Sequence, residues 1–470
     1  MSGVVSAALG LGGSAAERTV FIGVDVGTTT TKAVALDSTG SLVGSDSQAT
    51  QWIIGVNGEV EIDIDRLVDT VIEVLVRTAV SAGAGTRVAG IGITGMAEVG
   101  VVVTPDGHAA TLAMAWYDQR GADELAALPQ FFLDEFTAVT GLAAKAECSF
   151  AKLLWLRANG GPVLAGMQWL NALEFIAFRL TGVRASEPSL ASRTGLLDQA
   201  TVAPWAGALD LLGADADFIP RLVNAGTSLG PVQPSAPLEL RGAAVTVAGH
   251  DHLVGSVGAG AVGGDDLFDS CGTADVILRT VPRTLSNADR SNLVGRGLSA
   301  GRHVLPGSTA ILGATRSGLV LGRIMSMVGA EDRGARQQLA DTWRPDREPS
   351  GRVIVSEPPG WTNEVTVRLR DDAMPTDVWG AATEYVLAQT AELLKAVAEV
   401  AGPYQTAIAA GGWAQVKGVY RAKAQIMPGL AVSDIEFPGA TGAAMFAAQA
   451  AGVVSGPLTS SVLSNAQLTQ

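Results

Sequence analysis

The stretch FIGVDVGTTTTKAV at residues 21–34 decides the fold. The apolar residues 19–26 predict a buried strand, and KAVALD at residues 32–37 predicts its partner in a hairpin. A turn at residues 38–40 then leads into a third predicted strand, SLVGSD. Three strands joined by tight turns form a meander, which differs from the strand-to-helix step of a P-loop. The chain is therefore expected to begin as a β-meander with a Gly-Thr turn at its first corner.

This first turn carries residues that suit a phosphate group. Gly27 lets the chain turn tightly and approach a ligand, while the hydroxyls of Thr28 and Thr29 and nearby N–H groups can point at phosphate oxygens. Lys32 adds a compensating charge, and Asp25 can hold Mg²⁺ through water, since Mg²⁺ prefers few carboxylates and many waters. A plain threonine-rich hairpin, with Asp25 as a satisfied polar group, explains the same residues.

A second stretch repeats this pattern about half a chain later. LFDSCGTADVIL at residues 267–278, like residues 22–35, has an apolar strand containing Asp, a Gly-Thr turn and a second apolar strand. We therefore predict an internal duplication. The second turn contains Gly272 and Thr273, so the two turns would hold a polyphosphate from two sides of a cleft. Closure of two domains over it would exclude water.

The remaining pattern mixes helices and strands. Periodicity and composition predict helices at residues 65–80, 150–159, 171–180, 253–262, 378–401 and 440–452, and strands at 88–94, 99–103, 243–248 and 405–412. This order predicts layered α/β domains. The last of the helices is rich in alanine, and its small side chains permit close packing on a sheet.

Composition narrows the class of protein. The chain has 470 residues, of which 47% are hydrophobic and 17% charged, as in a globular protein of two or more domains. The net charge of −14 argues against broad nucleic-acid binding, but a local site with a metal ion can still hold a nucleotide. Cys148 and Cys271 are too few for a disulfide framework or a four-thiolate zinc site, so we expect a reduced, cytoplasmic protein.

The first 17 residues are small and apolar but lack a basic region. We therefore expect a flexible lead at residues 1–17 rather than a signal peptide. No uninterrupted apolar run reaches the roughly 18–20 residues of a membrane span, so no membrane association is expected.

A candidate general base follows the strand at residues 243–248. The strand leads into Gly249-His250-Asp251-His252. An acid at this place can accept the proton of a substrate hydroxyl while the oxygen attacks a γ-phosphate. A helix N-cap explains Asp251 equally well. Because adjacent side chains of an extended segment point to opposite faces, we do not expect these three residues to form a zinc site.

Two further motifs have weaker chemical meaning. Trp116, Asp118 and Arg120 place an aromatic surface beside a carboxylate and a guanidinium, which suits a polyol; an ordinary helix start with a surface ion pair explains them too. Gly411-Gly412-Trp413 follows a predicted strand, where glycines would let an adenine lie against the backbone. Gly-Gly after a strand is also a common turn.

Taken in order, these motifs resemble the FGGY carbohydrate kinases of the actin-like ATPase superfamily. The resemblance covers residues 19 to 452. Its motifs are VDVGTTTTKAV, SFAKLLWLRAN (149–159, with Ser149, Lys152, Trp155 and Leu156 of the first signature), FRLTG…ASRTGLLD (178–198), VAGHDHLVGSVGAG, DSCGTADV and AAGGW…GATGAA.

The resemblance implies an α/β fold of two duplicated ribonuclease-H-like (actin-like) domains with ATP, Mg²⁺ and a sugar in the cleft between them. The N-terminal domain would span residues 18–252 and the C-terminal domain residues 253–470. The implied catalytic base is Asp251, and the implied metal-side residue is Asp25. On the substrate side the resemblance implies Glu98 (in TGMAEVG), Trp116, Asp118, Asp251 and His252. On the nucleotide side it implies Gly27, Thr28, Thr29, Lys32, Gly272, Thr273, Gly313, Gly411, Gly412 and Trp413, whereas Thr30 and Thr31 simply continue the hairpin.

The sequence also departs from the family pattern. Met96-Ala97-Glu98 replaces the QMH of xylulose kinases and the QRE of glycerol kinases. SEPPGWTNEV at 356–365 replaces the GER-containing block, and GTA at 272–274 replaces GTS and is followed by an uncommon acid, Asp275. The expected function is ATP-dependent phosphorylation of a pentulose, tetrulose or sugar alcohol, and the alternative is a non-catalytic nucleotide or sugar sensor. The expected partner is that small molecule, with a homodimer as the assembly to test.

Overall fold

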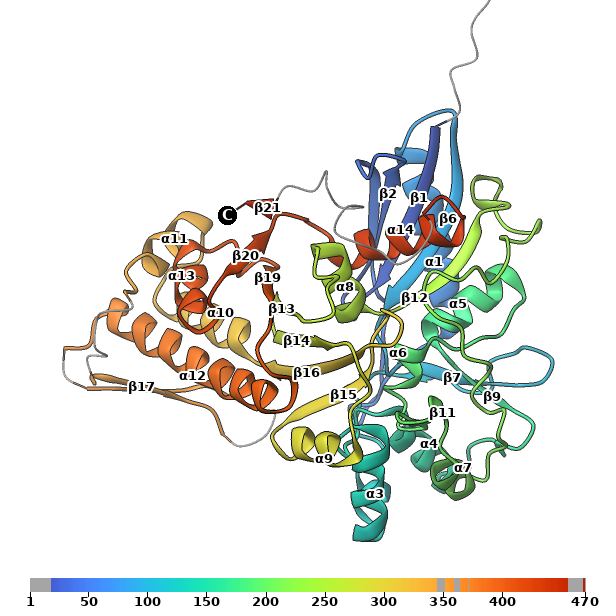
Figure 1. The fold of residues 1–470 in the computed structure, drawn as a ribbon, viewed down its shortest axis with the longest axis horizontal. Helices are drawn as coiled ribbons and strands as arrows, with labels where there is room; N and C mark the ends of the chain where they lie inside the picture. The colour runs from blue at the N-terminus through green and yellow to red at the C-terminus, as the bar shows by residue number, and fades with distance from the viewer. Residues whose placement is uncertain (1–17, 345–350, 359–363, 371, 455–467, 470) are drawn as a thin grey trace, which may run out of the picture.

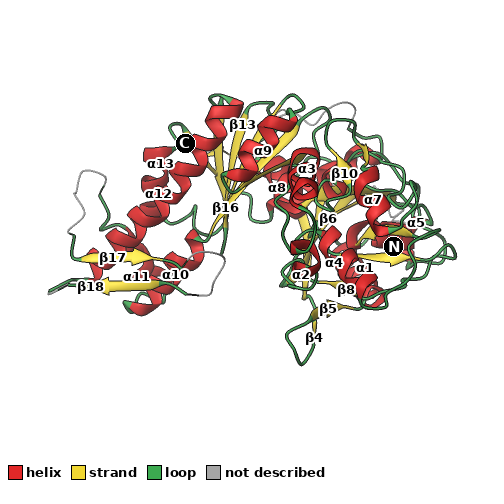
Figure 2. Cartoon of the chain, turned by 90° about the horizontal axis from the view of Figure 1, so that it is seen from below, coloured by secondary structure: helices red, strands yellow, loops and turns green. Residues whose placement is uncertain are grey.

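The computed structural model describes residues 18–344, 351–358, 364–370, 372–454 and 468–469. Two mixed β-sheets form the centres of two halves of the chain (Figures 1 and 2). The predicted lead at residues 1–17 lies outside the described residues. Among the described residues, none of the helices combines the length and the hydrophobicity that a membrane span requires.

The N-terminal sheet has the strand order β12-β6-β1-β2-β3. Its antiparallel part confirms the predicted meander: β1 (Arg18–Val26), β2 (Thr30–Asp37) and β3 (Leu42–Ala49). Strand β6 (Thr86–Gly95) lies parallel to β1, and β12 (Ala244–His250) lies parallel to β6. Thr30 and Thr31 belong to β2, as expected, and Asp25 faces Lys32 in the register of β1 and β2.

The C-terminal sheet repeats this arrangement. Its strand order is β15-β16-β14-β13-β19-β20-β21. The antiparallel strands β13, β14 and β16 and the parallel strands β19 and β20 correspond to β1, β2, β3, β6 and β12 in turn. The bounds are β13 (Asp266–Cys271), β14 (Asp275–Val281), β15 (Leu298–Arg302), β16 (Thr309–Thr315), β19 (Thr406–Ala410), β20 (Leu430–Ser433) and β21 (Leu468–Thr469). The predicted duplication is confirmed.

Helix α1 (Ile64–Ser81) covers one face of the N-terminal sheet. Asp63 caps it by accepting hydrogen bonds from the N–H groups of Asp65 and Arg66, as expected for an acidic N-cap. The apolar stripe that includes Leu67, Val71 and Leu75 is buried against the alternate side chains of β1.

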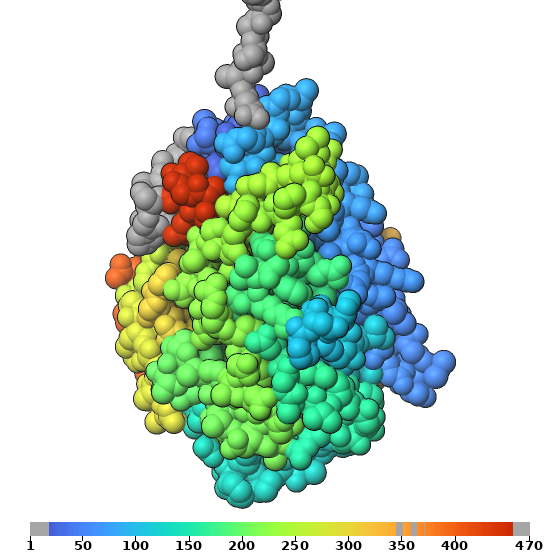
Figure 3. All heavy atoms as spheres, turned by 90° about the vertical axis from the view of Figure 1, so that its right-hand side faces the viewer, coloured from blue at the N-terminus to red at the C-terminus, as the bar shows by residue number. Residues whose placement is uncertain are grey.

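Helix α14 (Pro438–Ala450), from the far end of the chain, covers the opposite face of the same sheet (Figure 1). Figure 3 shows red atoms from the end of the chain on the surface beside blue and green atoms of the N-terminal half. Three strand glycines make this approach possible. A Cβ on Gly23, Gly90 or Gly92 would lie only 1.9–2.4 Å from a backbone carbonyl oxygen of α14. The predicted close packing of this alanine-rich helix on a sheet is confirmed, and the sheet it covers belongs to the other half.

The other helices surround the two sheets. Their bounds are α2 (Ala122–Ala126), α3 (Gln130–Thr140), α4 (Ser149–Ala158), α5 (Ala172–Thr181), α6 (Pro188–Ala191), α7 (Ala206–Leu212), η1 (Leu238–Leu240), α8 (Asp251–Ala259), α9 (Asn287–Gly295), α10 (Ser317–Met327), α11 (Arg333–Ala340), α12 (Pro375–Ala401) and α13 (Lys417–Ile426). Four small sheets contain β4 (Ile53–Ile54), β5 (Val60–Ile62) and β8 (Ala113–Met114); β7 (Gly100–Val103) and β9 (Gln168–Asn171); β10 (Leu197–Asp198) and β11 (Ala203–Pro204); β17 (Val353–Ser356) and β18 (Thr366–Leu369).

Strand β15 joins the two halves at one side. The N–H of Ala300 donates to the carbonyl of Gly141 at 2.9 Å, and the N–H of Arg302 donates to Oγ of Ser192 at 2.9 Å. The buried Arg290 of α9 also donates from Nε to the carbonyl of Ala138 at 2.7 Å. These contacts fix one edge of the C-terminal half against the N-terminal half, beside the site described next.

Candidate active site between the two sheets

A cavity of about 230 Å³ lies between the two halves. Both predicted hairpins border it, the first through Asp25 and Lys32 and the second through Phe268 and Ser270. The other lining residues come from the start of α8 and from the segment that leads into α14: Asp251, His252, Gly255, Glu436, Phe437, Pro438, Gly439 and Ala440. Residues distant in sequence therefore meet in one polar cavity.

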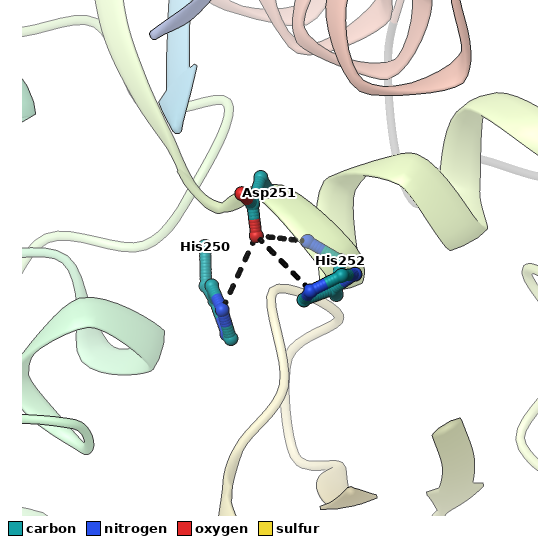
Figure 4. A group of neighbouring side chains, drawn as sticks. All are labelled: His250, Asp251 and His252. Carbon is teal, nitrogen blue, oxygen red and sulfur yellow. Dashed lines mark hydrogen bonds and ion pairs between the residues drawn. The ribbon is translucent and has the colours of Figure 1, made fainter. Parts of the chain in front are cut away.

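Asp251 lies at this cavity, where β12 ends and α8 begins (Figure 4). Its Oδ1 accepts a hydrogen bond from the N–H of His252 at 2.6 Å. The same oxygen lies 3.2 Å from Nε2 of His250 and 4.0 Å from Nε2 of His252. Both imidazole rings therefore turn toward one carboxylate oxygen.

The expectation that these three side chains diverge is wrong. The chain stops being extended at His250 and turns into a helix at Asp251, so strand alternation no longer applies. One ligand atom from each of His250, Asp251 and His252 lies within 4.8 Å of the others. The geometric argument against a shared cation at this place therefore fails.

The electrostatics of Asp251 suit a base at neutral pH. Burial, and then the charge of Glu98, raise the pKa of Asp251 to about 7, against the lowering effects of the His252 N–H and Arg193. Burial lowers the pKa of His250 well below its usual value and also lowers the pKa of His252. Both imidazoles are therefore neutral at pH 7, and Nε2 of His250, at 3.2 Å, lies within reach of a hydrogen bond to the carboxylate.

Asp25 has the properties of a cation ligand. Burial, and then the charge of Asp251, raise its pKa to about 7. Its Oδ1 is buried without a hydrogen-bond partner among the described residues, which is costly for a carboxylate oxygen. The carboxylates of Asp251 and Glu436 line the same cavity. This oxygen-rich donor set fits Mg²⁺.

Glu98 lies near Asp251 and forms an ion pair with Arg193, a residue that the motif did not predict. Nε of Arg193 donates to Oε1 of Glu98 at 2.7 Å, and Nη1 of Arg193 donates to Oγ of Ser299 at 2.9 Å. The side chain of Glu98 is 11% exposed and that of Arg193 is 22% exposed. Since Ser299 belongs to β15, this network connects the two halves beside the candidate base.

Trp116, which the resemblance places on the substrate side, contacts the first hairpin. Its Nε1 donates to Oγ1 of Thr28 at 3.1 Å, and Nε1 of Trp52 donates to the carbonyl of Thr28 at 2.7 Å. Oγ1 of Thr50 donates to the carbonyl of Gly27 at 2.7 Å. Thr29 is exposed at the tip of the turn. The two threonines expected to contact phosphate thus differ, because only the Thr28 hydroxyl is already engaged.

The carboxylate of Asp118 makes local contacts instead of facing the cavity. It accepts hydrogen bonds from the N–H groups of Val60 and Arg120, at 2.8 and 2.9 Å, and from the guanidinium of Arg120. The residue is 3% exposed. These bonds fix the loop that carries Trp116, so Asp118 has a structural role that the sequence did not reveal. Its contact with substrate stays a prediction.

The expected nucleotide residues of the C-terminal half gather around the second turn, with one exception. The N–H of Trp413 donates to the carbonyl of Cys271 at 3.3 Å, directly before Gly272 and Thr273, and a Cβ on Gly411 would lie 2.5 Å from that carbonyl oxygen. Gly412 and Thr273 are exposed. Gly313 instead lies in the middle of β16, where a Cβ would meet Leu298 and Leu393, so core packing accounts for it.

Sequence reasoning missed four residues at or beside the site: Ser270, Glu436, Arg193 and Trp52. When Gly27 is aligned with Gly272, Ser270 is the counterpart of Asp25, and both line the cavity. Asp269, the acid of the second strand, therefore lies one position away from the counterpart of Asp25. That one-residue offset was readable in the sequence, whereas the approach of Glu436, Arg193 and Trp52 depends on tertiary folding.

Comparisons with known proteins agree with this fold. The family model for the N-terminal domain of the FGGY family of carbohydrate kinases matches residues 20–258. The duplicated sheets with a cavity between them define a two-domain, actin-like α/β fold. This chain belongs to the FGGY family of carbohydrate kinases.

Individual relatives are more distant. A xylulose kinase from Bacillus subtilis (strain 168) is 26% identical over 263 residues, covering 55% of this chain and 52% of the relative. A glycerol kinase from Leifsonia xyli subsp. xyli (strain CTCB07) is 26% identical over 320 residues, covering 63% and 61%. These matches span little more than half the length of the curated relatives. The solved structure of a ligand-bound xylulose kinase from Lactobacillus acidophilus has a TM-score of 0.84 at 20% identity, covering 96% of this chain and 93% of that chain, which supports the fold.

Proposed function

We propose that this protein transfers the γ-phosphoryl group of ATP to a hydroxyl group of a small sugar or polyol. The observation that carries the proposal is Asp251: a carboxylate at a cavity between two sheets, flanked by two imidazoles, with a pKa raised to about 7. A base poised near the working pH takes a hydroxyl proton efficiently. Family membership and the kinase names of the relatives support the same class of reaction.

In this proposal each residue either reacts with the substrate or balances the charge of the phosphate groups. Asp251 accepts the hydroxyl proton as the oxygen forms a bond to the γ-phosphorus, and ADP leaves as the bond to the β-phosphate oxygen breaks. Asp25 would hold Mg²⁺, with Glu436 nearby, and Mg²⁺ when bound offsets the charge of the phosphate oxygens. Lys32 adds positive charge from the wall of the cavity, where its Nζ lies 5.5 Å from the centre of the Phe437 ring.

The proposed sugar side is the region of Glu98, Arg193, His252 and Trp116. Glu98 accepts hydrogen bonds, and Arg193 donates them, within a partly exposed pair. Such alternating acceptors and donors match the hydroxyl groups of a polyol. The proposed domains are residues 18–252 and 253–470, and α14 of the second domain packs on the sheet of the first.

The test is a substrate panel with product identification. Purified protein with Mg-ATP is assayed against tetroses, pentuloses and polyols, and the phosphorylated product is identified by mass spectrometry. We expect turnover of at least one member, and we expect Asp251→Asn to reduce kcat by about 10²–10⁴-fold, the usual worth of a general base. The exposed Asp210 of α7 gives the matched control, Asp210→Asn, which should retain full activity.

Two outcomes would overturn the proposal in different ways. A folded Asp251→Asn variant with normal turnover would remove Asp251 as the base. Calorimetric binding of nucleotide or sugar, without a phosphorylated product from any panel member, would favour the non-catalytic sensor.

A further inference from the structure

A buried ammonium group lies behind the second Gly-Thr turn. Nζ of Lys423, on α13, lies 2.6 Å from Oδ2 of Asp269 and 2.6 Å from Oδ2 of Asp275. The three residues are 3%, 0% and 1% exposed, respectively. We call them the Lys423 triad. None of them lines the cavity between the sheets.

The triad and the cavity lie on opposite faces of the same hairpin. Ser270 lines the cavity, and its neighbour Asp269 on strand β13 therefore points to the other face. Cys271 pairs with Asp275 in the register of β13 and β14, so Asp275 shares the face of Asp269. Asp275 closes the base of the turn, whose tip residue Thr273 is exposed.

The turn is also held from its two sides. The N–H of Leu319, on α10, donates to the carbonyl of Thr273 at 2.8 Å. A Cβ on Gly318 would lie 1.8 Å from the carbonyl oxygen of Gly272, so α10 presses directly on the turn. The Gly411–Trp413 loop contacts the carbonyl of Cys271. The Lys423 triad supports the turn from the face of the hairpin that lies opposite the cavity.

The charge balance of the triad is unusual for a group that only stabilises the fold. Two carboxylates face one ammonium, and Oδ1 of Asp269 and Oδ1 of Asp275 are buried without a hydrogen-bond partner among the described residues. Well-packed apolar side chains at such positions often stabilise a protein as much as an ion pair does. A buried ionic group does, however, restrict the positions of its side chains, because few alternative arrangements satisfy its charges and hydrogen bonds.

The position of Lys423 also rules out a metal ion as the cation of this cluster. Ligand atoms of Asp269, Cys271 and Asp275 lie within 4.8 Å of one another, as in a cation site. The ammonium group already lies within hydrogen-bond distance of both carboxylates. The cation of this cluster is therefore Lys423 itself.

We propose that Lys423, Asp269 and Asp275 are positioning residues that hold the Gly272–Thr273 turn in place to bind the phosphates of ATP. The proposal rests on the proposed kinase function and deepens it. It assigns the uncommon acid after GTA to the geometry of the nucleotide site. The triad contacts no substrate and acts through the backbone of the turn.

The test measures nucleotide affinity directly, without turnover. Calorimetry with Mg-ADP compares wild-type protein with Lys423→Met and Asp275→Asn. The matched control is Lys417→Met, because Lys417 is exposed on the same helix. Asp275→Asn leaves Asp269 to neutralise Lys423 and is therefore the variant expected to fold. We expect the Kd for Mg-ADP to rise about tenfold or more in both triad variants and to stay unchanged in the control.

A second measurement separates positioning from simple stability. The KM for an accepted sugar should stay near the wild-type value in Asp275→Asn, while the KM for ATP rises and kcat falls. A folded Asp275→Asn protein that binds Mg-ADP with wild-type affinity, or one that only melts earlier, would overturn the proposal. If the wild-type protein binds Mg-ADP but yields no phosphorylated product, the result would count against the kinase function alone. If the wild-type protein does not bind Mg-ADP, both the kinase function and the role of the triad would be contradicted.

Discussion

Gly439 and Asp25 approach so closely that a Cβ on Gly439 would lie 2.3 Å from Oδ2 of Asp25. Gly439 belongs to the first turn of α14, which begins at Pro438 without a side-chain cap. The positive end of a helix dipole therefore faces the Asp25 carboxylate. Helix α14, the last helix among the described residues, thus helps to hold an acid of strand β1 at the cavity.

Gly439→Ala should consequently impair activity. The added methyl group must displace either the Asp25 carboxylate or the start of α14, and misplacing the proposed cation ligand would reduce turnover. We expect kcat to fall by about tenfold or more, since misplacements of about 1 Å have large effects on rate. The control is Gly380→Ala in α12, where a Cβ would meet nothing within 4 Å. Equal steady-state kinetics for the two variants would contradict this prediction.

Gly92→Ala should act on stability. A Cβ at Gly92 would lie 1.9 Å from the carbonyl oxygen of Ala443, which is backbone and cannot rotate away. Overpacking of this kind costs about 1–3 kcal/mol or more. Denaturant unfolding should show a lower midpoint for Gly92→Ala and a normal or slightly higher one for Gly380→Ala, because alanine is the better helix former. An unchanged midpoint for Gly92→Ala would mean that α14 does not pack as described.

The pH dependence of activity should report the ionisation of Asp251. A general base works only when ionised, so kcat/KM for the sugar should rise with pH through about 7. Glu98→Gln removes a charge that raises the pKa of Asp251, and it leaves Arg193, which lowers it. The rising limb should therefore move to lower pH in Glu98→Gln. A pH profile that is flat below 7 in the wild-type protein would contradict the role of Asp251.

The pH dependence of stability should report the ionisation of Asp25. Its pKa is raised from 3.8 to about 7 by folding, so its favourable contribution is complete below about pH 4 and is lost as the pH rises through 7. Asp25→Asn has no such loss. In thermal unfolding without nucleotide, the variant should gain stability over the wild-type protein at pH 8 and much less at pH 5. A constant difference across this range would show that Asp25 titrates normally.

Thr28→Ala and Thr29→Ala should have different effects on the KM values for ATP and sugar. Thr29→Ala should raise the KM for ATP only, because Thr29 is exposed and the hydrogen bond of Trp116 goes to Thr28 instead. Thr28→Ala should raise the KM for ATP and also affect the KM for sugar, since its hydroxyl accepts the hydrogen bond from Trp116. Trp116→Phe, which removes that donor and keeps an aromatic ring, should reproduce the effect on sugar. Identical kinetics for Thr28→Ala and Thr29→Ala would exclude this link.

Local patterns predicted the framework of this fold. The apolar run at residues 19–26 and its partner at residues 32–37 predicted the first hairpin, and the Asp63 cap with its apolar stripe accounts for α1. The repeated Gly-Thr turns predicted the duplication. These features depend on neighbours within a few residues, which is the range over which a sequence pattern carries direct information.

The site was predicted less completely, because its contacts join distant parts of the chain. Lys423 and Asp275 are 148 residues apart, and Arg193 and Glu98 are 95 residues apart. No local pattern links such pairs. The convergence of His250 and His252 on Asp251 was missed for a different reason: it depends on whether the chain leaves the extended conformation one residue earlier or later.

The position of α14 has a consequence for biosynthesis. While a ribosome makes this protein, the face of the first sheet that carries Gly23, Gly90 and Gly92 is complete once β12 has formed, yet its cover is translated some two hundred residues later. Until then an apolar surface remains open to water and to other nascent chains. Folding of the N-terminal half therefore finishes only after the C-terminal half has been made, and a chain terminated before Pro438 should be prone to aggregate.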